Sequence, residues 1–299
     1  NRPHPARAQG QLRVIRLAFF LLMLLATPLS AEMVIRHLSG ESAVDARNEY
    51  FLAVLELALE KTATQGPWKL EPAEHSVPQS LALERLSNND GIEVVWSMTS
   101  IEREQQNRAI RIPLMKGLMG YRLLIIRTED QQWFRRLQTI DELRELRAGQ
   151  GHDWPDTEIL RANGLAVEGE EDYDNLFSLL QQGRFDYLPR AINEPWEELA
   201  ARPDMGLMVE QGLLLYYPTA EYFFVNKKNT ALAERLEKGL RLAIEDGSFD
   251  KLFREHPINA NAFGKANLLH RRVIRLDNPL LPKDTPFADR QLWWPSAKK

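Results

Sequence analysis

The residues best suited to binding chemistry are the hydroxyl side chains and the arginine that follow an apolar run at residues 92–96. Ser97, Thr99 and Ser100 come directly after this run, which predicts a buried strand, and Arg103 lies in the short charged stretch beyond it. The start of a helix exposes backbone N–H groups and the positive end of the helix dipole, so such a turn favours anions. The planar guanidinium of Arg103 could bind a carboxylate through two parallel hydrogen bonds.

Each of these residues also has a purely structural interpretation. Thr99 or Ser100 could simply cap the following helix, and Arg103 could be a solvated charge among neighbouring glutamates. Arg111 is the alternative arginine for the same role. If the hydroxyls and Arg103 do bind a ligand, we expect Trp96 to provide an aromatic wall beside them.

This segment resembles the ligand-binding segment of the periplasmic solute-binding proteins of the amino-acid-binding type (family 3, type 2 fold). Residues 100–103, Ser-Ile-Glu-Arg, match the Thr-x-x-Arg core in which the family's arginine holds the ligand carboxylate, and Pro113 supplies the stop that follows. The Gly-Arg-Phe-Asp of residues 183–186 is similar to a second-lobe element of these proteins. The Phe-Phe-Val-Asn-Lys of residues 223–227, followed by a helix with the Asp-Gly-Ser turn at 246–248, is similar to their returning strand and late helix.

The resemblance implies an α/β protein of two lobes, each a mixed sheet flanked by helices, with the ligand cleft between them. Lobe 1 would be discontinuous, built from residues 32–117 and 221–267, and lobe 2 would be residues 118–220. The hinge crossovers would fall near residues 116–120 and 217–221, and we expect residues 268–299 to form a C-terminal tail packed along the surface.

Local patterns predict the elements of these lobes. Apolar periodicity and breaker residues place them as follows: strands at 33–38, 68–72, 92–96, 121–126, 185–188, 213–217 and 222–225, and helices at 48–61, 78–86, 172–182, 194–201 and 230–246. Thr139 opens a capping-box sequence. A further helix is expected to begin within residues 152–156 and to end at the Asn-Gly pair of 163–164.

Two residues of the second lobe lie where the family has its anion-binding loop. Trp154 could stack on a ligand, whereas Asp153 could either contact the ligand or cap the next helix. Asp45, Arg47 and Tyr50, which follow the first strand, could reach the cleft or lie on the surface.

Arg190 marks a departure from the amino-acid-binding relatives. Where the family has an acidic residue that pairs with the ligand's ammonium group, this chain offers Arg190 or Ala191. An arginine there would favour a second anionic group on the ligand. The alternative is that Arg190 pairs with Glu194 or Glu197 of its own chain.

The N-terminus predicts export. Four arginines precede the apolar run at 17–25, and small residues lead to a cleavage site near Ala31, the pattern of a signal peptide over residues 1–31; an uncleaved anchor is the alternative. Removing these residues takes away four arginines and no acid, so the net charge moves from −4 to −8. Such a charge disfavours nucleic acid and anionic membranes as partners. The sequence has no cysteine, so it has neither disulfides nor thiolate metal ligands.

No catalytic, phosphate-loop or metal-ligand motif is evident in the sequence, so we expect a protein without catalysis, cofactor or metal. The combined prediction is a monomeric periplasmic binding protein for a small polar, carboxylate-bearing solute, anionic or zwitterionic, that serves an inner-membrane ABC permease or a sensor. One alternative is a signalling or interaction module that docks on a periplasmic protein. Another is an enzyme like the dehydratases of this fold, with these candidate acids and bases: Glu41, Asp45, Asp153 and Glu194.

Overall fold

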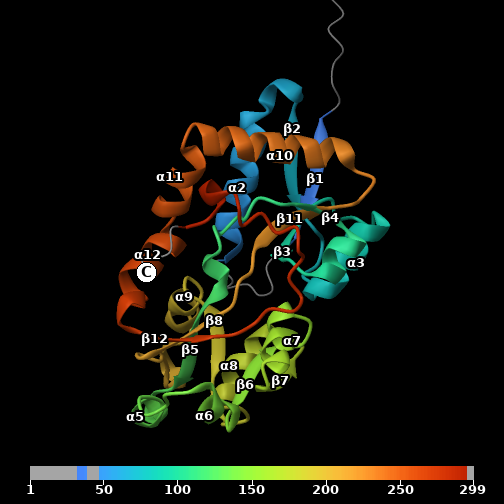
Figure 1. Ribbon diagram of the computed structural model, residues 1–299. Helices are drawn as coiled ribbons and strands as arrows, with labels where there is room; N and C mark the ends of the chain where they lie inside the picture. The colour runs from blue at the N-terminus through green and yellow to red at the C-terminus, as the bar shows by residue number, and fades with distance from the viewer. Residues whose placement is uncertain (1–31, 39–46, 295–299) are drawn as a thin grey trace, which may run out of the picture.

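Two groups of strands, one in each half of the molecule, organise the chain in the computed structural model (Figure 1). The structure describes residues 32–38 and 47–294. The predicted signal peptide, Glu41 and Asp45 therefore lie outside the described residues.

The first lobe contains a parallel pair and an antiparallel sheet. Strands β1 (Met33–His37) and β2 (Trp68–Pro72) run parallel, and β11 (Glu221–Val225) lies between β3 (Val95–Met98) and β4 (Arg108–Ile110). A bridge between His37 and Val94 joins the two groups. The helices of the first lobe are α2 (Arg47–Lys61), α3 (Gln79–Asn88), α4 (Ile101–Gln106), α10 (Thr230–Glu245), α11 (Ser248–Glu255) and α12 (Pro257–Lys265).

The second lobe is ordered around the buried strand β5 (Tyr121–Arg127). It pairs antiparallel with β8 (Leu188–Ala191), β9 (Leu207–Val209) and β10 (Leu213–Tyr216). A parallel pair, β6 (Arg147–Gly151) and β7 (Ala166–Glu170), is linked to the region before β8 by one bridge. The helices of this lobe are α5 (Gln131–Phe134), α6 (Ile140–Arg144), α7 (Pro155–Ala162), α8 (Tyr173–Gln181) and α9 (Pro195–Ala200).

Helices α2 and α10 pack closely because of one glycine. The inward face of α2 buries residues at helical spacing, which excludes water from the first-lobe core. On α10, Gly239 faces the backbone of Ala58, and a Cβ at this position would lie 1.9 Å from the Ala58 carbonyl oxygen. Only glycine therefore permits this distance between the helices.

Short-range signals for helix ends are confirmed. Thr139 accepts from the backbone N–H of Glu142, and Glu142 bonds back to Thr139, which completes the predicted capping box of α6. Asn229 caps α10 through its side chain. Helix α7 ends at Asn163, followed by Gly164 with φ of +79°, as the Asn-Gly pair predicted.

Two predicted strands are displaced along the chain. The strand expected at 92–96 is Val95–Met98, and the one expected at 185–188 is Leu188–Ala191. In the second case the observed strand includes Pro189, although proline cannot donate to a strand ladder. The strand tolerates it, since its partner β5 contributes the remaining bonds of the ladder.

The C-terminal segment connects the two lobes. It adds strand β12 (Arg272–Arg275) in parallel to β10 of the second lobe, so the expected surface tail contains a paired strand. It then runs back to the first lobe (Figure 1), where Leu280 accepts from the backbone N–H of Ile101 and Trp294 donates to the carbonyl of Lys116, both at 2.8 Å.

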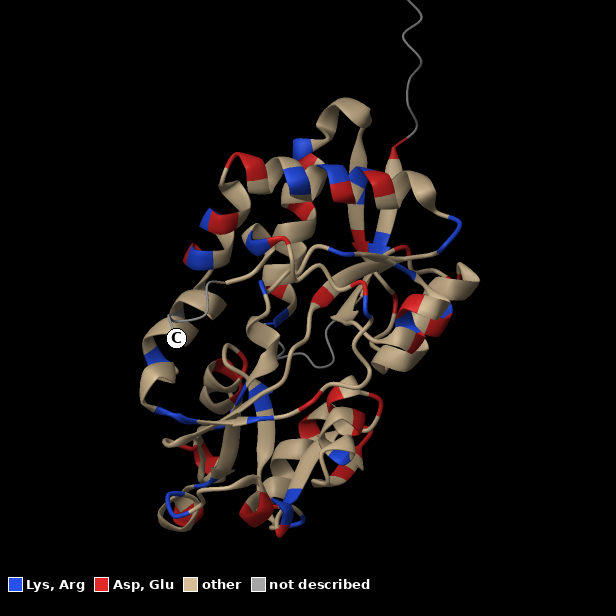
Figure 2. Cartoon of the chain, in the orientation of Figure 1, with Lys and Arg blue, Asp and Glu red and all other residues tan. Residues whose placement is uncertain are grey.

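Charged residues of both signs alternate over the two lobes in the view of Figure 2. Within residues 32–38 and 47–294, none of the helices combines the length and the apolar character needed to cross a membrane.

Candidate functional site

A small cavity lies where the two lobes meet. Its volume is about 60 Å³. The first lobe and the second lobe both contribute to its wall, which is formed by Leu38, Arg47, Asn48, Phe51, Gln79, Trp96, Met98, Met119, Arg122, Trp154, Pro155, Asp156, Arg190, Asn193, Glu194 and Glu221. The wall therefore combines apolar and aromatic side chains with charges of both signs, the usual composition of a site for a small polar molecule.

Arg103 is buried between the two lobes, but it is not among the residues that form the cavity wall. Its Nη1 donates to the side chains of Ser97 and Gln79, the latter at 3.1 Å, and to the carbonyl of Met98 at 3.1 Å. Its Nη2 donates to the carbonyl of Asp153 at 2.9 Å, across the two lobes. Burial lowers the pKa of Arg103 to about 10, because the charged form has lost its hydration. The guanidinium thus joins the lobes through neutral oxygens.

The other predicted residues of the first lobe have different surroundings. Ser100 is the N-cap of α4 and accepts from the backbone N–H of Arg103 at 3.1 Å, whereas Thr99 donates to Glu104 at 2.7 Å. Neither is on the cavity wall. Trp96 does lie on the cavity wall, and its indole stacks on the ring of Phe51 with ring centroids 5.8 Å apart.

Asp153 contacts the opposite lobe. Its carboxylate accepts from the backbone N–H of Ser80 at 2.7 Å, in the first turn of α3. The interpretation of Asp153 as the cap of α7 is wrong, because the N-cap residue is Trp154, without a capping side chain. The carboxylate of Asp153 instead interacts favourably with the exposed backbone amides and the positive dipole end of α3.

Trp154 and Arg190 stack on each other beside the cavity. The guanidinium carbon of Arg190 lies 4.8 Å from the centre of the Trp154 ring. Arg190 also donates to Glu198 through Nε at 3.0 Å and Nη2 at 2.6 Å, and its Nη2 lies 2.9 Å from Glu194. Burial alone would lower the pKa of Arg190, but attraction from Glu194 and Glu198 raises it above its ordinary value. Of the predicted partners Glu194 is observed, and Glu198 was not foreseen.

A second buried ion pair, which the sequence did not reveal, connects β5 to α7. Nη2 of Arg122 lies 2.8 Å from Oδ1 of Asp156, and the hydroxyl of Tyr217 donates to the same oxygen. Arg122 is only 2% exposed. The available signal was a single arginine within the otherwise apolar run of residues 121–126, which indicates a charge that must have a buried partner.

Glu221 is the other functional candidate that sequence analysis missed. It begins β11 and lines the cavity with only 7% of its surface exposed. Burial, assisted by the like charge of Glu194, raises its pKa to about 8. An acid immediately before an apolar strand was the available signal in the sequence.

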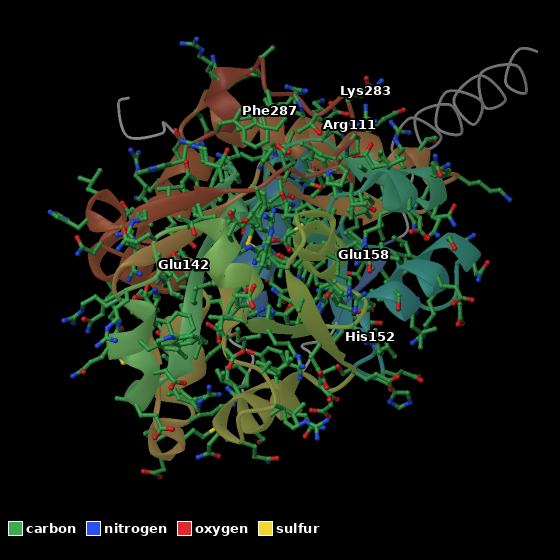
Figure 3. The ribbon with its side chains drawn as sticks, turned by 60° about the horizontal axis from the view of Figure 1, so that its bottom comes forward. Arg111, Glu142, His152, Glu158, Lys283 and Phe287 are labelled. Atoms are coloured by element: carbon green, nitrogen blue, oxygen red, sulfur yellow. The ribbon has the colours of Figure 1, made fainter. Side chains whose placement is uncertain are left out.

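The remaining nominated residues lie in the cleft, in the core and on the surface. Arg47 lines the cavity and donates to Glu194 of the other lobe at 3.3 Å. Tyr50 is fully buried, and its hydroxyl donates to the carbonyl of Leu114. Arg111, the alternative to Arg103, pairs with Glu104 and lies near the C-terminal segment, as Figure 3 shows, and away from the cavity wall.

Solved structures of known proteins share this architecture, whereas sequence comparisons find no match. No protein-family model and no curated protein sequence matches the chain. Among solved structures, an ancestral arginine-binding protein bound to arginine superposes with a TM-score of 0.56 at 14% identity, covering 76% of this chain and 98% of the other. An arginine-specific periplasmic binding protein of Salmonella typhimurium gives 0.57 at 16% identity, over 74% and 97% of the two chains. The chain has the type 2 periplasmic binding protein fold.

The same fold includes sensory proteins. A histidine kinase sensor domain, described as similar to periplasmic binding proteins, superposes with a TM-score of 0.54 at 13% identity, over 75% of this chain and 95% of the other. The predicted α/β fold of two lobes is thus confirmed. Identities this low show the fold and leave the ligand to be inferred from the cleft itself.

In this type 2 fold, the described residues bring most of the nominated side chains together at the lobe interface. Arg103 donates to the side chain of Ser97 and to the backbone carbonyl of Asp153, and the guanidinium of Arg190 lies over the ring of Trp154. Within the described residues, no group of three or more His, Asp or Glu side chains is arranged to hold a metal ion. The chemistry that the cleft offers is hydrogen bonding and ion pairing.

Proposed function

We propose that this protein binds a small polar solute with a carboxylate group between its lobes, without transforming it, and that a membrane transporter or receptor recognises the closed form. The site residues predicted from the sequence, with Arg103 as the carboxylate partner, form part of this proposal. The structural neighbours named above are two binding proteins and a sensor domain, which supports a binding role.

The contact of Arg103 with Asp153 is the observation that carries the proposal. Arg103 projects from the first lobe, and the acceptor of its Nη2 is a neutral backbone carbonyl of the second lobe. A carboxylate would be a stronger acceptor for the same guanidinium, because both partners are charged. A ligand carboxylate could therefore replace weaker contacts of Arg103 while the lobes remain together.

The proposal includes the organisation of the whole chain. We assign lobe 1 to residues 32–117 and 221–267, lobe 2 to 118–220, and the C-terminal tail to 268–299. The leader-like sequence of residues 1–31 supports export to the periplasm. There the protein would meet an inner-membrane ABC permease or a sensor as its partner.

Arg103→Ala is the first experiment. Loss of a buried, charged hydrogen bond to ligand should weaken binding by about 2–3 kcal/mol, roughly 30- to 150-fold. Residues 32–299 would first be screened by thermal shift against amino acids, dicarboxylates, uronic acids, polyamines and small peptides. Isothermal titration of the best ligand would then compare the native protein with the variant.

Two further variants make this result interpretable. Arg103→Lys keeps the charge but loses the planar fork, so affinity should fall here as well. Arg111→Ala removes an arginine that is 42% exposed and paired with Glu104, and it should leave affinity unchanged. Equal affinity in the native protein and both Arg103 variants would remove Arg103 from the site, and a panel without any stabilising compound would overturn the proposed function.

A further inference from the structure

A second, larger cavity lies beside the C-terminal segment, away from the cleft. Its walls come from three stretches of chain, within residues 116–121, 216–219 and 287–294, and we call it the C-terminal cavity. Its volume is about 560 Å³, within the range of about 300–1,000 Å³ that is usual for small-molecule sites. Among the described residues, none lines both this cavity and the one between the lobes. The C-terminal cavity is therefore a separate place where a small molecule could bind.

Aromatic rings form much of the wall of the C-terminal cavity. Tyr121 of β5 and Tyr216 of β10 lie with their ring centroids 4.7 Å apart, and Phe287 stacks on Trp293 at the same distance. Phe287 is nevertheless 47% exposed. A flat ring bound here would bury apolar surface that is exposed in this structure, and it could pack against these aromatic side chains. The wall therefore favours a planar aromatic ligand.

The charges around the C-terminal cavity favour an anion. Among the described residues, Lys116 and Arg290 line it and no acidic residue does. Lys116 is already paired with Asp250, whereas the side chain of Arg290 has neither a hydrogen-bond nor an ion-pair partner within the described part of the chain. Arg275 adds a further positive charge, since its guanidinium carbon lies 5.2 Å from the centre of the Tyr216 ring. An anionic ligand would complement these charges.

Thr219 gives the same wall a buried hydroxyl without a partner. It lies between β10 and β11 and is only 1% exposed. Its Oγ1 has no hydrogen-bond partner among the described residues. A buried polar group in this state is unfavourable and is rare in folded proteins. Because a hydroxyl can donate as well as accept, an oxygen atom of a ligand would satisfy it.

We propose that the C-terminal cavity is a second ligand site, which binds a small planar aromatic molecule with a carboxylate group. The ring packs against Phe287, Trp293 and Tyr216. The carboxylate accepts a hydrogen bond from the hydroxyl of Thr219 and is attracted by the positive charge of Arg290. Since this site shares no residue with the cavity between the lobes, its ligand is distinct from the solute proposed for the cleft.

The test compares aromatic carboxylates with two compounds that each lack one feature. Benzoate and indole-3-acetate would be titrated calorimetrically into the protein of residues 32–299. Cyclohexanecarboxylate has the charge without the aromatic ring, and benzamide has the ring without the charge. We expect the aromatic carboxylates to bind at one site per chain. Their affinity should exceed that of either comparison compound about fivefold, because aromatic packing and an exposed charge pair each contribute modestly.

Four variants locate the bound molecule. Thr219→Val keeps the shape of the side chain and removes its hydroxyl, so the affinity for benzoate should fall about tenfold, whereas the Tm of the free protein should not fall. Arg290→Gln should lower the affinity about fivefold, and by less at high salt. Arg136→Gln alters an exposed arginine of the second lobe as a matched control. Arg103→Ala alters the cleft, and in both of these variants benzoate should still bind as it does to the native protein.

The outcomes separate this inference from the proposed function. Loss of benzoate binding in Arg103→Ala, with binding retained in Thr219→Val and Arg290→Gln, would place benzoate in the cleft and overturn the second site. Equal binding of cyclohexanecarboxylate or benzamide would overturn the assignment of an aromatic acid. Binding of neither aromatic carboxylate would also overturn this inference, and the wider panel described above would still decide on the proposed function.

Discussion

Arg190 and Glu221 are both buried beside the cleft, and their surroundings act on them in opposite directions. Glu194 and Glu198 hold the charge of Arg190 within hydrogen-bond distance. Glu221 has a carboxylate oxygen without a partner and a pKa of about 8, caused first by burial. Arg190 is therefore paired with carboxylates of its own lobe. The charge of Glu221, in contrast, depends on what else occupies the cleft.

Glu221→Gln should change the pH dependence of stability. The pKa of Glu221 is about 8 in the folded protein and near 4.5 without the fold. Between these values the folded state holds a proton that the unfolded state has lost, so native stability should fall as pH rises from 4.5 to 8. The loss is at most about 5 kcal/mol. Urea unfolding at pH 5, 7 and 9 would measure it, and the variant should lack this decline. Parallel profiles for both proteins would contradict the raised pKa.

Arg190→Leu should destabilise the protein by about 3–5 kcal/mol, because it leaves the buried carboxylate of Glu198 without its arginine and takes one of the arginines away from Glu194. The double variant Arg190→Leu, Glu198→Leu should recover a large part of this loss. Arg241→Ala is the control, since its pair with Glu237 is about half exposed and contributes about 0–1 kcal/mol. Denaturant midpoints would rank the variants, and a small effect of Arg190→Leu would show that the ion pairs are dispensable.

At the scale of elements, the first lobe depends on the contact between α2 and α10. These helices are far apart in the sequence, and Figure 1 shows α10 lying across the first lobe near α2. The position of Gly239 against the Ala58 carbonyl fixes how closely they approach. Close packing here buries the apolar faces of both helices on the sheet strands that carry the cleft residues.

Gly239→Ala should destabilise the protein by about 2–4 kcal/mol, although alanine is the better helix former by about 1 kcal/mol. The reason is the clash of its Cβ with backbone, which cannot rotate away. Gly264→Ala in α12 is a matched control, because no heavy atom lies within 4 Å of its added Cβ. That variant should be neutral or slightly stabilised. Thermal unfolding of both variants would reveal the difference, and equal effects would contradict the packing described here.

At the scale of the whole molecule, polar contacts bring the lobes together around the cavity. The carboxylate of Asp153 meets the backbone of Ser80, its carbonyl meets Arg103, and Glu194 meets Arg47. The C-terminal segment adds a further connection, since it pairs with β10 and then bonds to Ile101 and Lys116 of the first lobe. These hydrogen bonds between the lobes lie where a bound ligand could reinforce them.

Asp153→Ala should favour separated lobes. It removes the charged acceptor of a hydrogen bond from the backbone N–H of Ser80, worth about 1.5–3 kcal/mol, so the equilibrium constant between closed and open lobes should fall about 10- to 150-fold. Small-angle scattering should show a larger radius of gyration, and ligand affinity should fall in parallel. Asp141→Ala, which breaks an exposed pair with Arg144, should change neither. Unchanged scattering in Asp153→Ala would show that other contacts suffice for closure.

The order of elements could be predicted from the sequence because its causes are local. The capping box at Thr139, the cap at Asn229 and the Asn-Gly end at 163–164 each act within one helical turn. Apolar periodicity likewise marked α2 and β5 within a residue or so of their ends. The strand expected at 185–188 failed because apolar residues alone do not specify register, which depends on the distant partner strand β5.

The sequence by itself was enough to predict the order of the elements and the two-lobed fold. It also showed that aromatic and charged residues lie near the strand ends. Tertiary structure alone decided which of these charges meet. Asp153 reaches Ser80 instead of capping its helix, and Arg190 is neutralised by its own carboxylates. Arg122 and Glu221 came to the cavity from strands that looked ordinary. Electrostatic energy depends on separation and burial, and both are fixed only when residues far apart in the chain fold against one another.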